Sequence, residues 1–168
     1  MNLKYGRLMK NKVLLLLPLT ALLCSCQTPP VVGPADCIQP CETKSSSDKD
    51  ISGKLALDLN QINASGSVEA KYKNTLGRDY SALSDKNCLL LLGMRAIECY
   101  KKQRIIDQPT AQRMAQDALQ AWRQAVGAPV TQAGAGGNVS ARELKLINRS
   151  PEAGYIKAEL AKGGLIRR

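Results

Sequence analysis

The stretch Cys88-Leu-Leu-Leu-Leu-Gly-Met-Arg-Ala-Ile-Glu-Cys-Tyr100 decides the fold of this 168-residue chain. Ser84 is a good N-cap just upstream, and Lys101 and Lys102 complement the helix dipole at the other end, so we expect one helix over 84–102. Apolar residues surround this helix instead of forming one stripe, which predicts the central buried element of a domain. Its expected core residues are Leu89, Leu92 and Ile97.

The following segment, 108–126, has the pattern of a partner helix. Asp107 can cap it, and Pro109 is tolerated in a first turn. Its apolar residues recur at helical spacing as Ala111, Met114, Ala115, Ala118, Leu119, Trp122, Ala125 and Val126. The short link 103–107 predicts an antiparallel αα-hairpin, in which Met114, Leu119 and Trp122 join the core. For Trp122 a packing role is favoured over a ligand platform.

The region before this hairpin is ambiguous. Leu55, Leu57 and Leu59 alternate with other residues, which predicts a short strand or hairpin over 54–69. The run from Val68 could equally be a helix that ends at Gly77. We therefore expect a mainly α protein with a small ordered domain over 51–126.

Two segments follow that domain. Residues 127–138 form a Gly-rich linker, and residues 139–168 carry seven bases and three acids. Ser140 and Glu143 match a capping box, so one short helix is expected there and a second near 155–161. Both are marginal alone, and a solvated basic tail is favoured over a segment that orders on a partner.

The N-terminus carries export signals. Four bases without an acid precede the apolar run Val13–Leu23, which is too short to span a bilayer as a helix. The pattern is typical of a signal peptide over 1–25. An ordinary cleaved signal peptide and an uncleaved anchor are the alternatives to the more specific interpretation that follows.

The residues Leu23-Cys24-Ser25-Cys26 resemble the lipobox of bacterial lipoproteins. This resemblance covers residues 1–26 only. It implies that Cys26 receives a diacylglycerol, becomes the first residue and is acylated on its amine, so that acyl chains hold the protein in a membrane. Gln27 stands where an Asp would retain a Gram-negative lipoprotein on the inner membrane, so in such a host we expect the periplasmic face of the outer membrane.

Residues 26–50 contain four prolines and three consecutive serines, and are expected to form an extended lipidated tether. Four cysteines remain in the mature chain, which favours disulfides. Cys88 and Cys99 would lie about 16 Å apart on one helix, too far to pair. A local Cys37–Cys41 bridge is slightly favoured, and the alternative is that each of these two crosses to the helix.

Composition narrows the function. The formal charge of +10 falls to +6 without residues 1–25, which still favours anionic surfaces, although no nucleic-acid motif accompanies it. The chain has no His, no nucleophile elbow and no phosphate loop, and we expect no enzyme, cofactor or metal site. An accessory lipoprotein that docks an envelope protein is the leading hypothesis. A protein that engages anionic glycan or lipid is the second, and an enzyme acting on peptidoglycan is the third.

Overall fold

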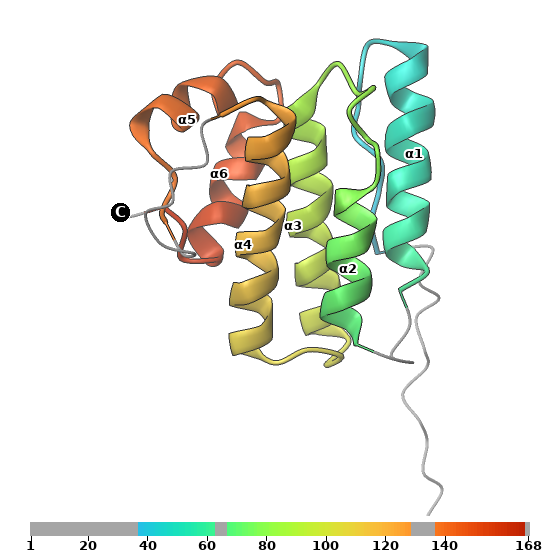
Figure 1. Cartoon of the computed structure of the whole chain (residues 1–168), viewed down its shortest axis with the longest axis vertical. Coiled ribbons are helices and arrows are strands. Elements are labelled where there is room, and N and C mark those ends of the chain that lie inside the picture. Colours follow the sequence, from blue (N-terminus) through green and yellow to red (C-terminus); the bar gives the residue numbers. More distant parts are fainter. Residues whose placement is uncertain (1–36, 63–66, 129–136, 167–168) are drawn as a thin grey trace, which may run out of the picture. The chain divides into compact units, whose positions relative to one another are not determined.

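The computed structural model describes residues 37–62, 67–128 and 137–166, and these parts of the chain are helical without a strand (Figure 1). The mainly α class is thus confirmed. The helices are α1 (Ser46–Asn60), α2 (Val68–Gly77), α3 (Lys86–Lys102), α4 (Gln108–Ala125), α5 (Ala141–Ile147) and α6 (Ala153–Lys162). No helix in the described residues is both long enough and apolar enough to cross a membrane.

Helices α3 and α4 form the expected antiparallel hairpin at the centre of the molecule (Figure 1). The Asp107 carboxylate caps α4 by accepting from the Thr110 amide, as predicted. The N-cap of α3 is Asp85 and not Ser84, because the Ser84 side chain is already bonded to Asp48 of α1. The helix therefore begins two residues later than expected.

Helix α3 contacts α1, α4 and α6, and α2 packs against α4. The side of α3 that faces α2 carries Gly93, which leaves room for close approach. A Cβ added at Gly93 would lie 3.1 Å from both the Ala118 Cβ and the Tyr72 hydroxyl. That hydroxyl donates to the Gly93 carbonyl at 2.9 Å. The missing side chain thus lets α2 and α4 reach the backbone of α3.

The strand or hairpin predicted over 54–69 is wrong. Residues up to Asn60 belong to α1, and α2 begins at Val68. Leu55 and Leu59 are four residues apart, so they share the buried face of a helix, whereas Leu57 is 53% exposed. The leucines that alternate in the sequence are therefore a buried helical pair, Leu55 and Leu59, with the exposed Leu57 between them. Residues 63–66 lie outside the described parts.

The local Cys37–Cys41 bridge is also wrong. The structure pairs Cys37 with Cys99 and Cys41 with Cys88, which is the crossing alternative. Four extended residues cover about 13 Å and eleven helical residues about 16 Å, so a segment that runs antiparallel to α3 brings both pairs together. Residues 37–50, which were predicted to belong to an extended tether, are therefore attached to the helical domain and include the start of α1.

The part of 139–168 that the structure describes is not a solvated tail. The expected capping box of Ser140 and Glu143 is present at the start of α5. Ile147 of α5 and Ile156 and Leu160 of α6 are fully buried. Neither helix would be stable alone, and each is held by the apolar residues that it places against the rest of the domain. The linker residues 129–136 lie outside the described parts.

Asp48 is a buried carboxylate that ties α1 to the start of α3. It accepts from the Ser84 amide at 2.9 Å, from the Asp85 amide at 3.3 Å and from the Ser84 hydroxyl. The hydroxyl hydrogen bond, followed by the amide of the same residue, lowers the pKa of Asp48 below its ordinary value of 3.8. The charged form is therefore stabilised by folding.

We expect each disulfide to contribute strongly to stability. In the chain-entropy description, closing loops of 62 and 47 residues stabilises the folded state by about 4 kcal/mol each, before any native-state strain is subtracted. Replacing Cys37 and Cys99 together by Ala, or Cys41 and Cys88 together, should lower the urea midpoint, and reductant should do the same to the wild type. Proteolytic digestion without reductant should release peptides that link Cys37 to Cys99 and Cys41 to Cys88. A peptide linking Cys37 to Cys41 would contradict the structure.

Asp48→Asn should destabilise the protein by about 2 kcal/mol at pH 7, since it removes charge-assisted hydrogen bonds from a buried site. The folded pKa is depressed, so the carboxylate contributes fully above pH 4 and its contribution is lost as the pH falls further. The difference in unfolding free energy between wild type and variant should therefore narrow below pH 4. Asp50→Asn, at an exposed position of the same helix, is the matched control and should change little.

Candidate functional site

The connection between α2 and α3 is held against α1 by one carboxylate. Asp58 accepts from the Arg78 guanidinium at 2.9 Å and from the Tyr80 hydroxyl at 2.8 Å. Burial, followed by the hydrogen bond to Asp58, raises the pKa of Tyr80 to about 12, so the phenol stays protonated at neutral pH. Two side chains of the connection are thereby directed toward α1.

Asp79, which lies between Arg78 and Tyr80, and Ser81, which follows them, form a tight turn. The Asp79 carboxylate accepts from the Ser81 amide at 3.1 Å and from the Ser81 hydroxyl. This is the local bonding typical of an Asx turn. The Ser81 hydroxyl, and then its amide, lower the pKa of Asp79, so that the turn carries a negative charge. The Lys86 ammonium donates to the Ser81 carbonyl and secures the turn from the α3 side.

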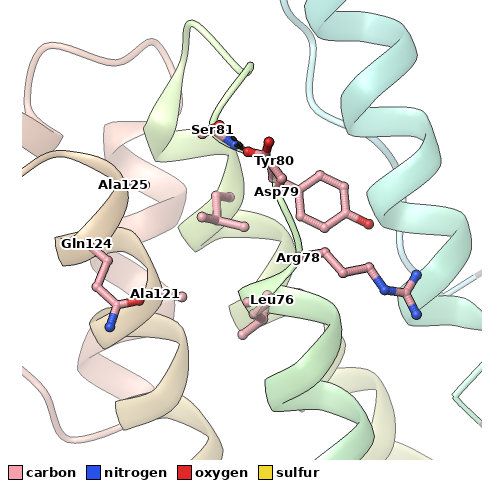
Figure 2. A pocket seen from close by; sticks show the side chains of 10 residues that line it. Leu76, Arg78, Asp79, Tyr80, Ser81, Ala121, Gln124 and Ala125 are labelled. Carbon is pink, nitrogen blue, oxygen red and sulfur yellow. Dashed lines mark hydrogen bonds between the residues drawn. The ribbon is translucent and has the colours of Figure 1, made fainter.

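A hollow of about 340 Å³ lies between this connection and the last turns of α4. Leu76 and Leu89, each only 3% exposed, lie at the bottom of the hollow, and the α4 side consists of Ala121, Gln124 and Ala125. Figure 2 shows the Arg78 side chain extending toward α1, away from the α4 residues, while the Asp79–Ser81 pair lies at the upper edge. Of the two charged residues that line this docking hollow, Arg78 is paired with Asp58, and the Asp79 carboxylate lies within the electrostatic influence of the Lys86 ammonium.

The docking hollow is lined by both apolar and polar groups. It offers an apolar surface beside one carboxylate, one hydroxyl and one amide. A carboxylate whose pKa is depressed is a weak general base, so the Asp79–Ser81 pair is poorly suited to activate a nucleophile. The complementary group is a side chain or ligand with an apolar body and a cationic or N–H donor at its tip.

The predicted core residues all lie inside the domain. Leu89, Leu92 and Ile97 of α3 and Met114, Leu119 and Trp122 of α4 are buried. Trp122 donates its indole N–H to the Asn87 side chain at 3.0 Å, so its polar atom is satisfied within the fold. Leu89 alone among the six also lines the docking hollow.

The lipobox residues Leu23, Cys24, Ser25 and Cys26 lie outside the described parts of the chain. Cys37 and Cys41 are covalently attached to α3. Within the described residues no group of three or more potential metal ligands gathers.

The acids that could be imagined as glycan-cleaving carboxylates are engaged separately. Glu69 pairs with Arg113 at 2.9 Å, Glu98 pairs with Lys101 at 3.3 Å, and Asp79 belongs to its own turn. Sequence reasoning did not identify the docking hollow. The Asp79-x-Ser81 spacing was a readable turn signal, but the arrival of Gln124 and Ala125 beside that turn depends on the packing of α4 against α2.

Comparison with known proteins gives no relative: no family model, no curated protein and no solved structure matches this chain.

Proposed function

We propose that this chain is a lipid-anchored envelope protein without catalytic activity, and that its helical domain docks a protein of a cell-envelope assembly. The observation that carries the proposal is the Leu23-Cys24-Ser25-Cys26 resemblance followed, eleven residues later, by a domain stapled through disulfides. Disulfides persist in oxidising compartments, and so support export.

The position of the Cys37–Cys99 disulfide limits the distance between the domain and the proposed lipid on Cys26. Eleven residues separate Cys26 from Cys37, and a fully extended chain of that length covers at most about 40 Å. Because Cys37 is bonded to Cys99 of α3, any pull on the anchor acts directly on the central helix. A short, covalently fixed connection suits a protein that holds a partner close to the membrane.

The docking hollow supports the second half of the proposal. Its apolar surface and single carboxylate form a small site that fits an apolar side chain next to a Lys or Arg of a partner. It lies beside the last turns of α4, whereas Cys37 is attached to α3 at Cys99.

The anchor is tested by a pair of serine substitutions in neighbouring cysteines. Cys26→Ser should abolish incorporation of labelled fatty acid and shift the protein from the membrane fraction to the soluble fraction. Cys24→Ser leaves a small residue in the lipobox and should change neither, which makes it the matched control. The intact mass of the mature protein should correspond to a lipid-modified Cys26. Membrane association that survives Cys26→Ser would contradict the anchor.

Docking is tested by a photoreactive amino acid placed at Gln124, on the edge of the hollow, in the native host. It should crosslink to a discrete envelope protein, whereas the same group at the exposed Lys54 of α1 should not. Ala121→Arg places a bulky cation beside Asp79 and should reduce the crosslink at least about fivefold, since a single well-placed interface residue is worth 1 kcal/mol or more. Equal crosslinking from both positions, or no effect of Ala121→Arg in a protein with unchanged unfolding midpoint, would remove the docking role.

A further inference from the structure

Helices α5 and α6 present a surface whose exposed charge is positive throughout. Over 137–166 the chain has five bases and three acids. All three acids are engaged within the fold: Glu143 with Arg123 of α4 at 2.5 Å, the buried Glu152 with Ser150 at 2.6 Å, and Glu159 with Lys162 at 2.6 Å.

The other four bases are Arg142, Lys145, Arg149 and Lys157, all exposed and without an acidic partner among the described residues. Arg142 and Lys145 are three residues apart on α5, so they lie on one face of that helix, and Arg149 follows in the next turn. We call Arg142, Lys145 and Arg149 the cationic ridge. Of the three acids over 137–166, Glu143 and Glu159 are paired with other bases and Glu152 is buried, so none forms an ion pair with the ridge.

The ridge lies at the other end of α3 from the proposed anchor. Asn87, in the first turn of α3, donates to the Leu146 carbonyl of α5 at 3.4 Å, whereas Cys37 is attached at Cys99. Twelve helical residues separate these points by about 18 Å. Figure 1 shows α5 beside the start of α3 and the α3–α4 connection at the opposite end. The ridge therefore lies near the start of α3, at the opposite end of that helix from the Cys37–Cys99 disulfide.

No cluster of large exposed hydrophobic side chains, of the kind that forms the core of a stable protein interface, occurs in the described parts of α5 and α6. Among the described residues of α5 and α6, Tyr155 is the one large hydrophobic side chain that is exposed, at 68%, in the first turn of α6. Spaced cations beside a single aromatic ring suit a hydrated polyanion that offers carboxylates and sugar faces.

We propose that the cationic ridge binds a carboxylate-bearing cell-wall glycan, with peptidoglycan as the chemical class. The inference rests on the proposed export to the envelope, and it adds a second, electrostatic contact to the one made by the lipid. Such contacts between exposed charges are individually weak and screened by salt, so the binding is cumulative and sensitive to ionic strength.

The test uses the Cys26→Ser protein, which keeps the whole mature chain without its lipid, and purified peptidoglycan sacculi. The protein should co-sediment with sacculi at low salt. It should be released at about 0.5 M salt, because the Debye length there is only roughly 4 Å and contacts between exposed charges are screened. Replacing Arg142, Lys145 and Arg149 together by Gln should weaken binding about tenfold. Replacing Lys44, Lys49 and Lys54 by Gln removes the same charge from exposed positions at and before α1 and should leave binding unchanged. Unchanged thermal midpoints establish that both variants fold.

Absence of co-sedimentation, or equal losses in the two triple variants, would overturn the proposal. So would binding to vesicles of phosphatidylglycerol and phosphatidylcholine in preference to sacculi, which would assign the ridge to a lipid surface. Because no lipid is attached in this assay, a failure to bind sacculi would not contradict the proposed lipid anchor at Cys26. Conversely, evidence against the lipid anchor would not change the result of the sacculus assay.

Discussion

The burial of the apolar part of α3 is the constraint on which the rest of this structure depends. Leucines at four successive positions, Leu89 to Leu92, point to all sides of the helix, so this turn needs cover all around, whereas Arg95, Glu98 and Lys101 remain partly exposed further along. Helix α4 covers one side, α6 a second and α1 a third, and α2 approaches over Gly93. A chain with one Trp, five Tyr and no Phe builds most of this core from aliphatic residues, and the leucines of α3 contribute a large part of it.

The same helix also receives both disulfides, and this joins stability to attachment. Cys37 and Cys41 fix an extended segment along α3, and Asp48 then binds the turn that precedes α3. The N-terminal side of the domain is thus tied to the central helix by two covalent bonds and a buried carboxylate. In the proposed lipoprotein, the strain of membrane tethering would reach the best-packed part of the molecule, where local opening is least favourable.

The sequence allowed the hairpin to be predicted because each signal there was local and redundant. The stripe from Ala111 to Trp122, the Asp107 cap and the short link all pointed to the same arrangement, and the six named core residues are buried. Where one local signal stood alone, it misled: the alternating leucines of α1 imitated a strand. The crossed disulfides and the packing of α6 depend on contacts between residues far apart in the chain, which no local pattern encodes. The docking hollow belongs to the same class, since its two walls come from α4 and from the α2–α3 connection.

Net charge illustrates how much the fold changes the meaning of a composition. Of the formal +10, four charges belong to the segment that resembles a signal peptide, and others are consumed in pairs such as Arg123 with Glu143 and Arg113 with Glu69. Arg123 is informative because it lies on α4 and neutralises an acid of α5. By doing so it leaves Arg142 and Lys145, on the exposed face of that short helix, without a neighbouring counter-charge. The exposed positive charge of 137–166 therefore depends on the fold as well as on the number of bases, because Glu143 and Glu159 are held in ion pairs and Glu152 is buried, while Arg142, Lys145 and Arg149 are exposed.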